Sequence, residues 1–127
     1  MLFADTSYLV GVFVSNDGWH ERAMEIARGI SEEIAVTDHV FSEFITLVSK
    51  RSGNKAAYEA GRQILESDLA VLPTERADLV SALEYVRKHP GISMCDAVSA
   101  AVMQNLGIRR ILSFDSDFDD LGFERIS

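Results

Sequence analysis

Four acidic side chains stand where a fold of alternating strands and helices would bring them together. Asp5 ends the first apolar, strand-like run, and Asp115 directly follows the fourth. Glu43 lies early in the helix predicted after the second strand, and Asp96 lies in the first turn of the helix that precedes the fourth. In such folds, ligands bind beyond the carboxyl ends of the strands. The spacing therefore predicts that these carboxylates share one edge of a sheet.

Carboxylates within a few ångströms of one another repel, so a cluster of this kind needs a cation. Ligation by oxygen alone is typical of Mg²⁺ or Mn²⁺, whereas zinc normally takes histidine or cysteine. The three histidines, His20, His39 and His89, show no paired ligand spacing. Hard divalent ions can activate a water and stabilise the charge that develops on a phosphodiester. The acids thus indicate metal-dependent hydrolysis of phosphodiester bonds.

Each of these acids also has a purely structural interpretation. Asp5 opens an Asp-Thr-Ser sequence, any residue of which can cap the short helix predicted to follow. Ser93 and Asp96 have the spacing of a capping box. Glu43 fits a solvated helix face, and the acids within residues 115–120 fit a turn after a strand. Their joint placement, rather than any single acid, favours a site.

Short apolar runs rich in β-formers alternate with segments of three-to-four-residue apolar spacing. The predicted strands are Leu2–Ala4, Ile34–Thr37, Leu69–Leu72, Arg110–Ser113 and Phe123–Ile126. The predicted helices are Tyr8–Phe13, Trp19–Ile30, Val40–Val48, Ala57–Leu65, Thr74–Lys88 and Ser93–Leu106. This alternation indicates a mainly parallel sheet with helices on both faces. We expect one three-layer α/β/α domain over residues 1–127.

Apolar stripes on the predicted helices are expected to face the core. Trp19 opens one stripe, at helical spacing from Ala23, so core packing is its expected role. Another stripe runs along the helix that opens after Pro73, and its members are Leu79, Ala82, Leu83 and Val86.

The composition excludes several classes of protein. Twelve basic and twenty acidic residues leave a net charge of −8, so no broad basic face dominates the surface. The single cysteine, Cys95, can form no internal disulfide, which is typical of a reducing compartment. The N-terminus lacks the basic region of a signal peptide, and the longest apolar run, Tyr8–Val14, is far shorter than the roughly 20 residues of a membrane span. A cytoplasmic protein without membrane contact is predicted.

Four motifs, in order along the chain, resemble those of PIN-domain ribonucleases, and most closely the small VapC-like toxins of toxin–antitoxin pairs. They are Leu2-Phe-Ala-Asp5-Thr-Ser, Ser42-Glu43-Phe44, Ser93-Met-Cys-Asp96-Ala-Val-Ser-Ala-Ala-Val and Ile111-Leu-Ser-Phe-Asp115-Ser-Asp117-Phe118. The resemblance covers essentially the whole chain. It implies a five-stranded sheet of order 3-2-1-4-5 and a metal-dependent endoribonuclease acting on RNA.

The resemblance also implies roles for individual acids. Asp5 and Asp96 match the principal ligands of Mg²⁺ or Mn²⁺, which they would contact directly or through water. Glu43 and Asp115 match outer ligands, and Asp117 is able to share the fourth position. All four acidic positions are filled, so the sequence gives no reason to expect an inactive site.

The same resemblance implies hydroxyl groups near the site and protein partners for the chain. The family places a serine or threonine near the site, which matches Thr6 and Ser93 as groups that orient a ligand carboxylate. Members of this size often form homodimers and are inhibited by a small antitoxin protein that covers the active site. A segment of the antitoxin could bind in an apolar groove, and the residues expected to line that groove are Phe41, Phe44, Leu47 and Val48.

An acidic nuclease must still hold RNA, whose phosphates usually pair with lysine or arginine. One stretch of the chain is locally basic, and its candidate contacts to RNA or a partner are Lys50, Arg51, Lys55 and Arg62. A solvated helix face is the alternative explanation for these charges. Unpaired bases could stack on aromatic side chains such as Tyr8, Trp19 and Tyr58.

Two other classes of protein with acidic sites do not fit the sequence. A receiver domain needs adjacent acids near the first strand, and a haloacid-dehalogenase-like phosphatase needs a second acid two residues after Asp5, where Ser7 stands. Two alternatives stay open. One is a catalytically silent PIN-like module that binds RNA or protein, and the other is an RNA-processing nuclease that is not a toxin.

Overall fold

The computed structural model describes residues 1–127 and contains one sheet of five strands. The strands are β1 (Leu2–Ala4), β2 (Ile34–Thr37), β3 (Ala70–Leu72), β4 (Arg110–Leu112) and β5 (Glu124–Ile126). Their order is β3-β2-β1-β4-β5, and every neighbouring pair is parallel. The predicted sheet and its strand order are confirmed.

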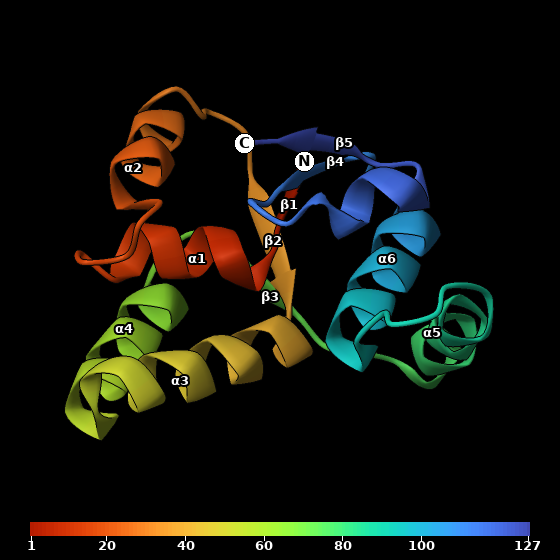
Figure 1. Cartoon of the computed structure of the whole chain (residues 1–127), viewed down its shortest axis with the longest axis horizontal. Helices are drawn as coiled ribbons and strands as arrows, with labels where there is room; N and C mark the ends of the chain where they lie inside the picture. Colours follow the sequence, from red (N-terminus) through yellow and green to blue (C-terminus); the bar gives the residue numbers. More distant parts are fainter.

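Helices connect the strands and cover both sides of the sheet. They are α1 (Thr6–Phe13), α2 (His20–Arg28), α3 (Asp38–Ser52), α4 (Asn54–Glu66), α5 (Arg76–Lys88) and α6 (Met94–Leu106), with a short 3₁₀ helix η1 (Ser116–Leu121). In Figure 1, α1 to α4 lie to the left of the sheet and α5 and α6 to its right. None of the helices has the length and apolarity needed to cross a membrane.

The central strands are short and fully covered, which places polar residues directly at their ends. All three residues of β1 are buried, as expected for a parallel strand packed on both faces. Phe3 pairs with Ile111 and Ala4 with Leu112 in the register of β1 and β4. The residue that follows β1, Asp5, therefore stands beside the residues that follow β4. This edge is the switch point, because β2 and β4 lie on opposite sides of β1.

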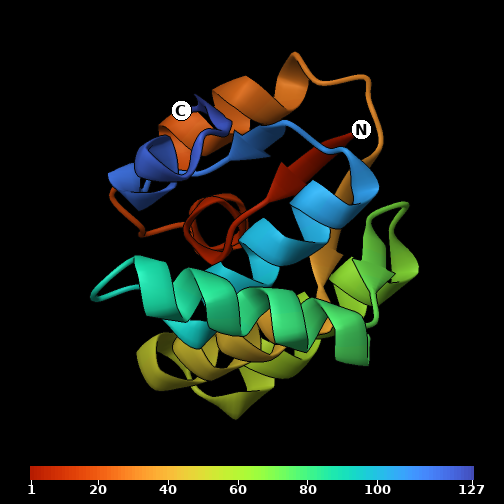
Figure 2. The same cartoon turned by 90° about the vertical axis from the view of Figure 1, so that its right-hand side faces the viewer.

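Helix α5 lies outermost, across α6, as Figure 2 shows. Within its predicted apolar stripe only Ala82 is buried, against small residues of α6. Leu79, Leu83 and Val86 are 38%, 60% and 42% exposed. The expectation that the whole stripe faces the core is wrong, because α5 packs on another helix through one narrow side rather than on the sheet.

Candidate active site

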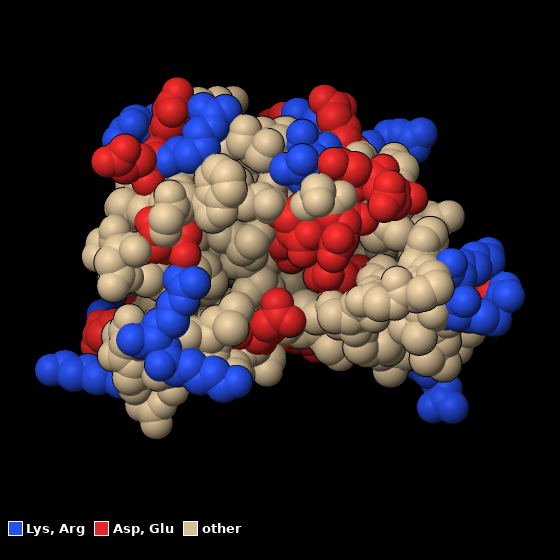
Figure 3. Space-filling view, in the orientation of Figure 1, with Lys and Arg blue, Asp and Glu red and all other residues tan.

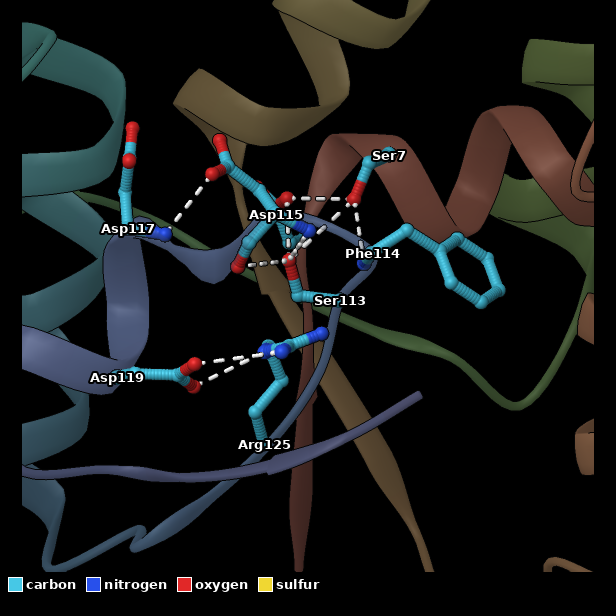
Figure 4. A network of polar contacts seen from close by, with 8 residues as sticks. Ser7, Ser113, Phe114, Asp115, Asp117, Asp119 and Arg125 are labelled. Atoms are coloured by element: carbon cyan, nitrogen blue, oxygen red, sulfur yellow. Dashed lines mark hydrogen bonds and ion pairs between the residues drawn. The ribbon is translucent and has the colours of Figure 1, made fainter.

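Asp5 is held at the end of β1 by two serine hydroxyls (Figure 4). Ser7 and Ser113 donate to its Oδ2 at 2.8 and 2.9 Å. The two serine oxygens themselves accept backbone N–H groups from the turn after β4, Ser7 from Phe114 and Ser113 from Asp115, each at 3.0 Å. Because those N–H groups occupy the acceptor side of each hydroxyl, the hydroxyl protons are directed at the carboxylate. The turn and the acid are thus fixed relative to each other.

Burial is the main influence on Asp5, which is only 4% exposed. It raises the pKa of the carboxyl group, although the hydroxyls of Ser7 and Ser113 act in the opposite direction. A charged carboxylate at this position is therefore costly without a nearby cation.

Of the two hydroxyls expected to orient a ligand carboxylate, one contacts such a group. The Oγ of Ser93 accepts the N–H of Asp96 at 3.1 Å as a helix cap, and a hydrogen bond between the Ser93 and Asp96 side chains lowers the pKa of Asp96 against the larger causes that raise it. The Oγ1 of Thr6, by contrast, is buried without a hydrogen-bond partner. The prediction for Thr6 therefore fails by one residue, since Ser7 does what was assigned to it. Ser113 stands 108 positions from Asp5 and is brought there by the pairing of β1 with β4.

Three aspartates come together beside Asp5. One carboxylate oxygen each of Asp96, Asp115 and Asp117 lies within 4.8 Å of the others. They come from the first turn of α6, the residue after β4 and the start of η1. Asp115 also caps η1, because its Oδ1 accepts the N–H of Asp117 at 2.9 Å. The structural interpretation of Asp115 is therefore confirmed and is compatible with the functional one, since one oxygen caps while the carboxylate still joins the cluster.

Like charges and burial dominate the electrostatics of this cluster. Burial, followed by the negative charges of Asp5, Asp115 and Glu43, raises the pKa of Asp96 to about 7. Glu43 approaches from α3, and after burial its charge is the next cause that raises the pKa of the Cys95 thiol. The structure therefore brings all the acids expected from the sequence to one place.

No basic side chain forms an ion pair with these acids, although Arg125, which is paired with Asp119, also feels the charge of Asp115. Every ion pair of the molecule lies elsewhere, and none includes a member of the cluster or Glu43. Figure 3 shows the acids as a red patch near the middle of one face. The donor set, which is made of carboxylate oxygens, fits a hard divalent cation. Such an ion would offset the mutual repulsion.

The predicted basic contacts lie on α3 and α4, away from the acids. Arg51 pairs with Asp17 at 2.6 Å, and Arg62 pairs with acids on its own helix. Lys50 and Lys55 take part in no ion pair. In Figure 3 basic side chains gather at the lower left, apart from the acidic patch. Of the four, only the two lysines are unpaired, whereas Arg51 is paired with Asp17 but still half exposed.

A large apolar groove of about 820 Å³ lies between α3 and α4, but only part of its expected lining is there. Phe41 does line it, whereas Phe44 and Val48 are 0% and 2% exposed and belong to the core. The predicted groove was placed on the wrong side of α3, because core and groove faces both carry apolar residues. Its other apolar lining residues are Ile45, Ala57, Tyr58 and Leu65.

The sequence matches known proteins along its whole length. A family model described as PIN domain matches residues 2–124. The 23S rRNA-specific endonuclease VapC20 of Mycobacterium tuberculosis is 32% identical over 99% of this chain and 98% of its own length. Ribonuclease VapC13 from the same organism is 28% identical over the full length of both chains.

Solved structures share the fold. Mycobacterium tuberculosis VapC20, described as a sarcin-ricin loop cleaving toxin, has a TM-score of 0.91 at 29% identity, over 97% of this chain and 96% of that chain. A toxin–antitoxin complex from Klebsiella pneumoniae has a TM-score of 0.73 at 13% identity, over 100% and 97% of the two chains. The second likeness concerns the fold alone.

Proposed function

The chain belongs to the PIN-domain family, and we propose that its acidic cluster is the active site of a metal-dependent endoribonuclease, the toxin of a toxin–antitoxin pair. One observation carries this proposal. Asp96, Asp115 and Asp117 converge beside the buried Asp5 without a basic partner. Such an arrangement destabilises a fold unless a cation binds, so it is a feature of function. The proposed nuclease unit is the whole chain, residues 1–127.

Asp96, Asp115 and Asp117 are the residues we expect to hold the ion, with Asp5 as the fourth acid beside them. Mg²⁺ or Mn²⁺ suits this set of oxygen donors. When bound, such an ion lowers the pKa of a water and stabilises charge on a phosphodiester.

The side chains around the cluster position its acids and the reacting groups. Ser7 and Ser113 fix the direction of the Asp5 carboxylate, which would otherwise rotate. Glu43 enters from α3, and its negative charge helps to raise the pKa of Asp96, so we expect it to act on the same site as an outer acid. These groups together hold a reacting phosphate and a water in one geometry.

The proposed substrate is RNA, and 23S ribosomal RNA is the first candidate because the VapC20 relative is specific for it. The sarcin-ricin loop is the corresponding short substrate, since that relative is described as cleaving it. Ribosomes lie in the cytoplasm, which is therefore the proposed location.

The proposed protein partner is a small antitoxin, and the α3–α4 groove is where we expect a segment of it to dock. The groove is apolar along Phe41, Ile45 and Leu65. Lys50 and Arg62 stand in its lining. An apolar segment flanked by acidic residues matches both its chemistry and its charge.

A homodimer stays a prediction, and we infer that it forms through α5. Its exposed apolar residues are Leu79, Val80, Leu83 and Val86. If two copies paired antiparallel across a two-fold axis, Arg87 and Lys88 in the last turn of one helix would face Glu75 before the first turn of the other. Light scattering after size exclusion should therefore show a dimer in the wild type and a monomer in Leu83→Arg.

The test of the enzyme is cleavage of an RNA pool that contains 23S rRNA, with Mg²⁺, Mn²⁺ or EDTA. We expect cleavage that requires a metal ion and is lost in Asp5→Asn and in Asp96→Asn, because the amide keeps the shape and removes the charge. Asp68→Asn, an exposed acid far from the cluster, is the matched control and should cleave normally.

The other outcomes separate the alternatives. Folded protein that binds RNA with metal present yet cleaves nothing would support the catalytically silent module. Cleavage without growth arrest on expression would support an RNA-processing nuclease that is not a toxin. Growth arrest that disappears in Asp96→Asn would support the toxin.

A further inference from the structure

Trp19 and Phe114 form a stack of two aromatic rings, and Phe114 belongs to the turn that carries Asp115. Their ring centroids are 4.6 Å apart and their planes differ by 4°. Phe114 directly precedes Asp115 in the chain, so its backbone is within one residue of the cluster. Trp19 is 53% exposed, and the expectation that it packs in the core is therefore wrong. A large apolar ring is thus left in water, stacked on a residue of the same turn that carries Asp115.

The ring beneath Trp19 is firmly held. The backbone N–H of Phe114 donates to Ser7, the same serine that orients Asp5 (Figure 4). A Cβ at Gly11 would lie 3.2 Å from the Phe114 ring, so the glycine leaves room for that ring against α1. Phe114 therefore supports one face of the indole, and the exposed area of Trp19 is its opposite face and its edges.

A positive charge is attached to the same loop. Asp17 accepts the backbone N–H of Trp19 at 3.0 Å and the Arg51 guanidinium at 2.6 Å. Arg51 stays 51% exposed. A nucleotide presents a flat base and a phosphate to a protein, and here Asp17 links the backbone of an exposed aromatic residue to an exposed guanidinium.

We propose that the outer face of Trp19 is a stacking site for one unpaired base of the RNA substrate, with Arg51 beside the phosphate of that nucleotide. The proposal rests on the proposed ribonuclease function. Proteins bind single-stranded RNA by stacking its bases on aromatic rings, and every base has a suitable face. The other two aromatic candidates differ, because Tyr8 is 3% exposed and Tyr58 lines the α3–α4 groove.

A base fits this surface better than a protein segment does. The apolar groove suited to a docked segment lies between α3 and α4, and Trp19 does not line it. Trp19 presents one aromatic face, whose orientation is fixed by the nearly parallel ring of Phe114. Stacking of flat groups is the contact that such a plane makes.

Fluorescence gives a direct test, because Trp19 is the single tryptophan of the chain. The Asp96→Asn protein in EDTA is titrated with an oligoriboadenylate of about 12 nucleotides and with an abasic ribose-phosphate chain of equal length. We expect the adenylate to quench the emission and the abasic chain to leave it unchanged. Equal quenching by both chains, or binding of the adenylate without quenching, would overturn the proposal.

Kinetics give an independent test with the full wild-type site. Trp19→Leu keeps apolar bulk without an aromatic plane, and Trp19→Phe restores a plane. On the RNA that the wild type cleaves, we expect Trp19→Leu to raise KM by about 5- to 100-fold with kcat nearly unchanged, and Trp19→Phe to recover most of the loss. An unchanged KM in a folded Trp19→Leu protein would assign the ring to a protein contact and overturn the proposal.

The two proposals fail in different ways. If the wild type cleaves no RNA but base-dependent quenching is seen, the ribonuclease function fails and the stacking site stands. If cleavage is normal and quenching is absent, the stacking site alone fails.

Discussion

Opposite ends of the same strands carry acids in opposite electrostatic states. At the amino ends, Glu32 precedes β2 and accepts the guanidinium of Arg110, the first residue of β4, at 2.6 Å. The N-terminal amine before β1 lies 3.2 Å from the same carboxylate. The hydrogen bond from Arg110, followed by that from the N-terminus, lowers the pKa of Glu32. At the carboxyl ends, burial and neighbouring acids raise the pKa of Asp96 to about 7.

This difference supports a structural role for the amino edge and the proposed active site at the carboxyl edge. The chain supplies its own cations to the amino edge, where the charges are exposed and contribute little to stability. It forms no ion pair with the acids of the carboxyl edge, where partial burial makes repulsion stronger. An unneutralised cluster of acids is a cost to the fold that a bound cation removes. Four predictions test this contrast, beginning with the largest expected effect.

Activity should depend on the carboxyl edge alone. Asp96→Asn should lower RNA cleavage by at least about 100-fold, since the ion loses a charged ligand. Glu32→Gln, at the amino edge, should leave cleavage unchanged, because that carboxylate pairs with Arg110 and not with the cluster. Initial rates on one RNA under saturating metal measure both. Similar losses in the two variants would contradict the contrast.

A metal ion should stabilise the fold through the same edge. Mn²⁺ at about 100 times its dissociation constant should add about 2.7 kcal/mol to the free energy of unfolding of the wild type. Asp96→Asn should lose most of this gain, while Glu32→Gln keeps it. Thermal melts with and without Mn²⁺ provide the measurement. A gain that survives in Asp96→Asn would place the ion elsewhere.

The serines that orient Asp5 should matter for metal affinity. Ser113→Ala removes one hydroxyl from the Asp5 carboxylate, and we expect Mn²⁺ binding to weaken by about 10- to 100-fold. Ser7→Ala should have a similar effect. Ser31→Ala, an exposed serine at the amino edge, is the control and should bind normally. Calorimetric titration measures all three, and equal affinities would show that Asp5 needs no such support.

The pH dependence of stability should carry opposite signs at the two edges. In EDTA, the raised pKa of Asp96 means that the native state keeps a proton which the unfolded chain releases near its ordinary value of 3.8. The contribution of Asp96 to stability is thus fully present below about pH 4 and is lost as the pH rises to about 7. Glu32, whose pKa is lowered, loses its contribution as the pH falls instead.

Melting temperatures in EDTA from pH 4 to pH 8 test these signs. Asp96→Asn should remove much of the fall that the wild type shows toward pH 7. Excess Mn²⁺ should reverse the wild-type trend, because protons compete with the ion for the same carboxylates. A wild type whose stability in EDTA rises steadily over this range would contradict the raised pKa of Asp96.

Local patterns in the sequence predicted most of the fold. Short apolar runs mark all five strands to within one residue at each end. The signal is clearest for β1, which is buried on both faces and is wholly apolar. Helix ends follow from local chemistry, as at Gly107, whose φ of 72° ends α6. The acids of the site were predictable for a related reason. Parallel strands joined by helices bring their carboxyl ends to one edge, so Asp5 and Asp115 had to meet there.

Only the tertiary structure decided which neighbour each side chain meets. Ser113 reaches Asp5 from 108 positions away, and no local pattern distinguishes it from Thr6 as the hydroxyl for this task. Trp19 and Leu83 fit apolar stripes, yet both are exposed. The spacing of apolar residues predicts that one face of a helix is apolar. Whether that face is buried depends on what the rest of the chain packs against it. The sequence therefore determines the elements and the edge where the acids gather, while long-range packing decides the hydroxyls, the exposed ring and the uncovered helix face.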